Sequence, residues 1–145
     1  MDAPEFRPGE YLTFRLAGQE FAIDATRVKG IVPLHDLEMG EPLEGGPRWL
    51  LGRAAVHGRS VPVLDLARWL SLAGAARGPN PYILAVESAC PDAHGGIVGF
   101  PVDRVCGVVL ARARHYSNGK LRIGRARRVL DADRLFAARV VQATP

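Results

Sequence analysis

The chain has 145 residues, of which 48% are hydrophobic, and it carries a formal net charge of +4. This length and composition predict one domain, or two very small ones sharing a core, and exclude a globally disordered chain. No apolar run approaches the roughly 18 residues that a membrane-spanning helix needs, and no signal pattern opens the sequence. The two cysteines give neither a disulfide framework nor a metal knuckle. These features predict a cytoplasmic protein without membrane insertion.

Short strands dominate the predicted elements. The first nine residues, with two prolines and a glycine, predict a flexible arm. Turns are expected at Gly18-Gln19 and at Asn118-Gly119, and a closing helix is expected over residues 131–138. The runs that alternate or are continuously apolar predict strands over residues 10–16, 20–24, 30–34, 59–64, 82–86, 97–102, 105–110 and 128–130. Many short strands with few helices indicate a mainly β chain built from small barrels.

The stretch Trp49–Leu70 predicts a hairpin followed by a short helix. His57-Gly58 suits the tight turn, because glycine adopts positive φ readily and histidine tolerates it better than most residues. Pro62 in the returning strand cannot donate a ladder hydrogen bond, so it predicts an edge strand or a bulge. Asp65 stands where a helix N-cap would be.

Two pairs of segments recur in the same order along the chain. FAIDATRVKGIV (21–32) resembles FPVDRVCGVV (100–109), and VLDLARWL (63–70) resembles VLDADRLF (129–136). Short β segments with aspartate caps can look alike by chance, but two pairs in register favour a real duplication. The sequence therefore predicts two similar small barrels packed face to face.

The residues of catalytic and metal sites are dispersed. The four histidines show no metal-binding spacing, and no nucleophile elbow or phosphate loop occurs. Cys106 lies in an apolar run, which predicts a buried structural thiol rather than a nucleophile. Turn and cap duty accounts together for the aspartates that follow apolar strands, Asp24, Asp65, Asp103 and Asp131. We therefore expect no enzyme, no metal site and no cofactor.

The basic residues crowd the last third of the chain, especially residues 112–128. An arginine cluster can bind phosphates, which makes an Arg-rich β-barrel nucleic-acid-binding protein the alternative function. No aromatic platform alternates with these arginines for base stacking, which favours a solvated, partner-facing strand pair instead.

Four ordered blocks resemble the CheW family, the adaptors that couple chemoreceptors to the histidine kinase CheA. They are Phe14 to Ile31 with Gly18, Glu20-Phe21-Ala22-Ile23-Asp24 and Val28; Gly52 to Leu66 with Gly58, Val61-Pro62-Val63 and Asp65; Gly99 to Val108 with Val102-Asp103 and Val105; and Leu130-Asp131 to Leu135. The resemblance covers roughly residues 10–138. It implies two five-stranded SH3-like barrels with short helices, a domain over 10–140 whose two intertwined barrel subdomains change over near 75–81, and a tail over 141–145.

The resemblance implies binding rather than catalysis. One surface would meet the regulatory domain of a CheA-type kinase, and a groove between the barrels would receive a chemoreceptor's helical tip, as a further partner. Apolar side chains in a groove suit an amphipathic helix, although Val28, Val105 and Val108 could equally be ordinary core residues. Carried over by alignment, the partner-binding positions are Val28, Gly30, His57, Gly58, Tyr82, Val105 and Val108.

Two departures from the family pattern fall at these positions. The family usually has Arg where His57 stands and Glu where Gly30 stands, and those two side chains lie close enough to pair. Both ends of that interaction are absent here. This difference favours a specialised scaffold, in a pilus-type or other nonstandard array, over a general coupler.

Overall fold

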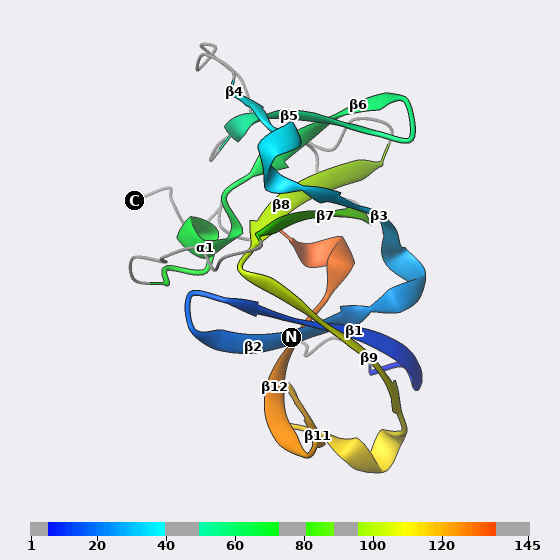
Figure 1. Cartoon of the computed structure of the whole chain (residues 1–145). Helices are drawn as coiled ribbons and strands as arrows, with labels where there is room; N and C mark the ends of the chain where they lie inside the picture. Colours follow the sequence, from blue (N-terminus) through cyan, green and yellow to red (C-terminus); the bar gives the residue numbers. More distant parts are fainter. Residues whose placement is uncertain (1–5, 40–49, 73–80, 89–95, 136–145) are drawn as a thin grey trace, which may run out of the picture.

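The computed structural model describes residues 6–39, 50–72, 81–88 and 96–135 (Figure 1). The one α-helix among them is α1 (Leu66–Trp69), and four 3-10 turns are η1 (Ala25–Arg27), η2 (Leu34–Asp36), η3 (Ala113–His115) and η4 (Ala132–Arg134). The strands are β1 (Gly9–Leu16), β2 (Gln19–Asp24), β3 (Val28–Pro33), β4 (Glu38–Met39), β5 (Leu50–Val56), β6 (Arg59–Leu64), β7 (Tyr82–Glu87), β8 (Ile97–Val102), β9 (Arg104–Ala111), β10 (Tyr116–Ser117), β11 (Lys120–Ile123) and β12 (Arg125–Leu130).

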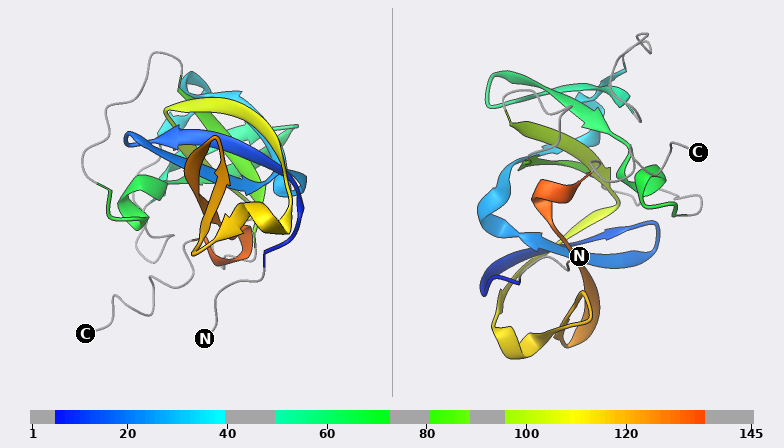
Figure 2. Two further views of the ribbon diagram at one scale, coloured as in Figure 1. Left: turned by 90° about the horizontal axis from the view of Figure 1, so that it is seen from below. Right: turned by 180° about the vertical axis from the view of Figure 1, so that it is seen from behind.

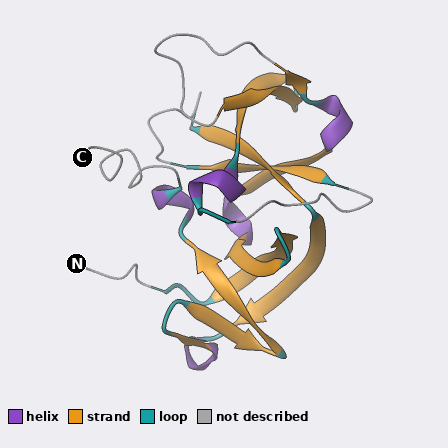
Figure 3. Ribbon diagram, turned by 90° about the vertical axis from the view of Figure 1, so that its left-hand side faces the viewer, coloured by secondary structure: helices purple, strands orange, loops and turns teal. Residues whose placement is uncertain are grey.

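These strands form two sheets that curl and stack on each other (Figure 3). Sheet A has the order β10-β11-β12-β2-β1-β9, and sheet B has the order β3-β7-β8-β6-β5-β4. Each sheet contains one strand of only two residues, β10 or β4, beside five longer ones. The mainly β architecture expected from the sequence is confirmed.

The strand order reveals the internal duplication directly. Each strand from β1 to β6 occupies the same place in one sheet as the strand numbered six higher occupies in the other sheet. For example, β3 and β9 are both edge strands. Sheet A combines β1 and β2 with β9–β12, whereas sheet B combines β7 and β8 with β3–β6. Each half of the chain therefore begins in one sheet and completes the other. The predicted changeover at 75–81 lies almost entirely outside the described residues.

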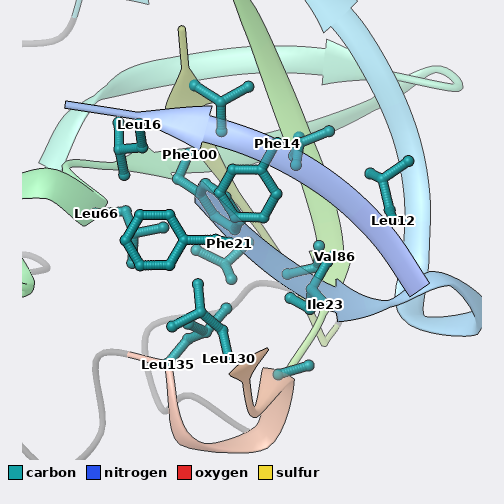
Figure 4. Close-up of a cluster of buried hydrophobic side chains, with 14 of the residues drawn as sticks. Leu12, Phe14, Leu16, Phe21, Ile23, Leu66, Val86, Phe100, Leu130 and Leu135 are labelled. Carbon is teal, nitrogen blue, oxygen red and sulfur yellow. The ribbon is translucent and has the colours of Figure 1, made fainter. Parts of the chain in front are cut away.

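The largest hydrophobic cluster lies between the two sheets. Phe14, Phe21 and Phe100 are fully buried there, with ring centroids 5.6 Å apart between Phe14 and Phe21 and 5.8 Å apart between Phe14 and Phe100 (Figure 4). η4 also lies between the sheets and contributes to this cluster through Ala132 (Figure 1 and Figure 2). Burying each phenylalanine contributes about 1.5–3 kcal/mol, so this shared core joins the two sheets into one unit.

The two predicted tight turns are confirmed. His57 and Gly58 have φ of 50° and 78°, and the Asn118-Gly119 pair has φ of 51° and 76°. Both hairpins therefore use two left-handed residues, as expected for a type I′ turn. The turn predicted at Gly18-Gln19 is displaced by one residue, because Ala17 takes φ of 53°. Its N–H donates to Oδ2 of Asp103 (3.0 Å), a contact with the far half of the chain.

The aspartate caps are also confirmed, but the helices after them are shorter than predicted. The carboxylate of Asp65 accepts from the backbone N–H of Arg68 (3.1 Å), and α1 ends at Trp69. Ser71 has φ of 59° and Leu72 N–H donates to Ala67 O (2.9 Å), a Schellman-type stop before the predicted end. The C-terminal helix is the 3-10 turn η4, and residues 136–138 of the prediction lie outside the described residues.

Two further predictions need correction. Pro62 is inside sheet B, since β6 lies between β5 and β8. The sheet tolerates it because the pairing of β6 with β8 is limited to Val63 opposite Gly99. Cys106 is exposed rather than buried. The register between β1 and β9 passes from Gly107 to Val105, so Cys106 is the extra residue of a bulge on an edge strand.

Candidate partner-binding surface

The two strands β3 and β9 hold equivalent places in the duplication, each at one edge of its sheet. In the described part of the chain, the large hydrophobic residues that stay exposed are on these two strands: Ile31 at 44%, Val108 at 55% and Leu110 at 60%. An edge strand offers unpaired backbone groups, and exposed apolar side chains add a contact surface. Together they make β3 and β9 the best candidate for a partner-binding surface.

Exposed and half-buried residues alternate along β9, and the exposed residues from Cys106 to Leu110 are apolar. Val105 and Val109 are half-buried, whereas Cys106, Val108 and Leu110 are exposed. Val108 stands opposite Leu12 and Leu110 stands opposite Glu10 on the neighbouring strand β1, whereas the other side of β9 has no paired strand in the described fold. A second chain could cover the exposed row.

The turn between β5 and β6 closes against β3. Nε2 of His57 donates to the carbonyl oxygen of Lys29 (3.0 Å). A Cβ at Gly30 would lie 2.5 Å from Cγ1 of Val56 and 3.6 Å from Nε2 of His57. Val56 is buried and β-branched, so it has little freedom to move away. Only glycine at this position lets the hairpin approach β3 so closely.

The structure brings some of the predicted partner-binding residues together and separates others. Gly30 and His57 are in contact distance, with exposed Gly58 beside them at the turn. Val28 and Val105 are half-buried and both pack on the central cluster, as the core interpretation predicted for them. Val108 faces outward instead.

Tyr82 lies apart from this group. It stands opposite Pro33, whereas Val28 stands opposite Val86 at the other end of the β3–β7 pair. Its half-buried side chain packs on the central cluster, so its place indicates a core role more than a surface one.

Sequence reasoning missed Ile31 and Leu110 as surface residues. Both lie in nearly continuous apolar runs, and such runs predict burial on both faces of a strand. The signal that could have found them is the duplication, because equivalent strands at equivalent edges expose equivalent faces.

An ion-pair network fixes the start of β3. Arg27 makes a two-pronged contact with Asp133 of η4 and lies 3.5 Å from Oε1 of Glu87 on β7. The hydrogen bond to Asp133 raises the pKa of Arg27, against the lowering effect of burial. The network therefore links both sheets beside the candidate surface.

A cavity of about 260 Å³ adjoins this network, and several polar groups that line it bind one another. Asp131 accepts from the backbone N–H of Asp133 (3.0 Å), and the Tyr11 hydroxyl donates to Arg7 O (2.7 Å). Burial and the charge of Asp24 raise the pKa of Tyr11. The described residues contain no group of three potential metal ligands.

Comparison with known proteins identifies the family. A family model of the CheW-like domain matches residues 10–139. The chain belongs to the CheW-like domain family. A solved structure, that of the scaffolding protein TtCheW from Thermoanaerobacter tengcongensis, matches with a TM-score of 0.72 at 19% identity, covering 91% of this chain and 94% of that one. No curated protein matches the chain.

These matches confirm the fold expected from the resemblance, a CheW-like domain of two SH3-like β-barrels. The family match also supports the coarse function, a non-enzymatic scaffold or adaptor in chemotaxis signalling. Within the part of the chain that the structure describes, no helix is long and apolar enough to span a membrane.

Proposed function

We propose that this CheW-like domain is a cytoplasmic adaptor that docks the regulatory domain of a CheA-type histidine kinase and presents β3 and β9 to a chemoreceptor tip. The observation that carries the proposal is the family match over residues 10–139, nearly the whole chain. The exposed residues Ile31, Val108 and Leu110 support the receptor part, since an amphipathic helix needs an apolar surface to pack on.

Kinase docking is tested with the full chain and the regulatory domain of its cognate kinase. Calorimetric titration should give saturable binding at micromolar concentrations. No binding at tens of micromolar, with both proteins folded, would remove the proposal.

Receptor contact is tested at the outward row of β9. Val108→Ser together with Leu110→Ser should weaken co-sedimentation with a soluble receptor-tip fragment, because it removes most of the exposed apolar area of that strand. Ala113→Ser, an exposed substitution in η3, is the control and should leave binding unchanged. Equal binding by all variants would place receptor contact elsewhere.

The pair Gly30 and His57 tests whether the two family departures act together. Gly30→Glu with His57→Arg should restore more receptor coupling jointly than the sum of the single changes. Any side chain at Gly30 meets Val56, so the melting temperature of each variant must be measured alongside. Purely additive effects would argue against this assignment of the groove.

A further inference from the structure

The outward face of the β11–β12 hairpin carries a row of basic side chains. Lys120 stands directly opposite Arg128, and Arg122 stands opposite Ala126 on the same face, two residues further along β11. All four residues are exposed. Like charges directly opposite each other destabilise a strand pair, so this row costs stability where a neutral one would not.

Nothing in the described fold neutralises the row. Residues 112–128 contain seven basic residues (Arg112, Arg114, Lys120, Arg122, Arg125, Arg127 and Arg128) and no carboxylate. Among the described residues, no carboxylate forms an ion pair with Lys120, Arg122 or Arg128. Arg122 instead donates from Nε to the hydroxyl of Ser117 (3.3 Å).

Within the described chain, Glu20 is the carboxylate that forms ion pairs with the arginines of β12, and it is already surrounded. Glu20 contacts Arg125, and its oxygens lie 3.4 Å from Nε of Arg127 and 3.9 Å from Nε of Arg15. Burial alone would raise the pKa of Glu20, but the hydrogen bond from Arg125 and the charges of the three arginines lower it. One negative charge shared by three guanidinium groups leaves this end of sheet A positive.

We propose that the outward face of β11 and β12, formed by Lys120, Arg122 and Arg128, docks an acidic segment of a partner protein. Arginine binds carboxylates through two parallel hydrogen bonds, and Arg27 already does so with Asp133 in this fold. Alternate residues of an extended chain recur about every 7 Å. An extended acidic segment therefore repeats its carboxylates at the spacing of Lys120 and Arg122.

Two other anionic partners fit this face less well. Single-stranded nucleic acid favours aromatic stacking platforms, and the ring of Tyr116, on the strand paired with β11, is stacked on Phe6 at 4.6 Å between ring centroids. A membrane surface favours apolar side chains beside the cations, but the large exposed ones of the described chain lie on β3 and β9. This docking surface goes beyond the adaptor function and uses different strands.

The test is fluorescence anisotropy with the full chain and a labelled peptide of alternating Glu and Ser, beside oligothymidylate of equal charge and vesicles containing phosphatidylglycerol. The peptide should bind best at low salt. Lys120→Gln with Arg128→Gln should weaken its binding at least about tenfold. Arg59→Gln with Arg68→Gln removes the same charge from exposed positions of sheet B and α1, and should weaken it less than about twofold.

Each other result would overturn the proposal. Equal weakening by both double variants would assign binding to net charge alone. Tighter binding of the oligonucleotide or of the vesicles would assign the face to that class of partner, and an absence of peptide binding at low salt would remove the site. Titration of the Lys120 and Arg128 variant with the kinase regulatory domain separates this result from any failure of the adaptor function.

Discussion

Gly30→Ala tests the close approach of the β5–β6 turn to β3. The added Cβ would lie 2.5 Å from Cγ1 of Val56, about 1 Å inside the optimal separation of two carbon atoms. Relieving that overlap requires a new Val56 rotamer or a shift of the hairpin, which costs about 1–3 kcal/mol in a packed core. Alanine also restricts the unfolded chain, which offsets about 0.4–1 kcal/mol. With the middle of each range, the expected net loss of unfolding free energy is about 1.3 kcal/mol.

Urea titration of the single variants and of the double variant measures this contact. Val56→Ala alone should cost about 1.6 kcal/mol for two buried methyl groups, plus a term for the cavity. In the double variant the clash disappears and the new methyl group enters the vacated space, so the combined loss should fall below the sum by about 1–2 kcal/mol. A neutral or stabilising Gly30→Ala, or strictly additive losses, would show that Gly30 and Val56 are not in close contact.

Three further predictions concern charge and the hairpin turns. Because the folded pKa of Glu20 lies below its unfolded value of about 4.5, its stabilisation is full above that pH and declines as the pH falls through the folded pKa. Glu20→Gln should therefore lower the urea midpoint at pH 7 and flatten its decline as the pH falls below about 4.5; an unchanged acid decline would contradict this. Lys120→Gln should raise the unfolding free energy by about 0.2–1 kcal/mol by removing a like-charge pair, while Arg59→Gln should change it by less than about 0.5 kcal/mol; equal effects would contradict the pairing. His57→Ala should cost about 0.5–1.5 kcal/mol through the lost bond to Lys29, and a smaller change would show that the imidazole is idle.

Local chemistry explains which features could be predicted from the sequence. The turns at His57-Gly58 and Asn118-Gly119 depend on residues that tolerate positive φ, and the caps at Asp65 and Asp131 depend on side chains next to the backbone groups they bind. The duplication was visible because equivalent strands keep similar sequences. Family resemblance then indicated the two-barrel fold and the scaffold function.

Features that depend on distant strands could not be predicted in this way. The turn predicted at Gly18 lies one residue earlier, at Ala17, whose N–H donates to Asp103 in the far half of the chain. α1 ends at Trp69 rather than near the next glycine, and Ser71 beyond it takes the left-handed conformation. A proline in a strand predicts an edge or a bulge, and the sequence does not show that the ladder between β6 and β8 is short enough to accept Pro62 inside the sheet.

The strands, the tight turns at His57-Gly58 and Asn118-Gly119 and the aspartate caps are predictable because each depends on residues close together in the chain, and the repeated pattern is visible in the printed sequence. Contacts between distant parts of the chain make β3 and β9 edge strands, leave Cys106, Val108 and Leu110 facing outward, and close the turn at His57 on Gly30. The sequence of an apolar strand does not show whether one of its faces or both are covered in the fold. Which face stays open depends on how the two halves of the chain exchange strands.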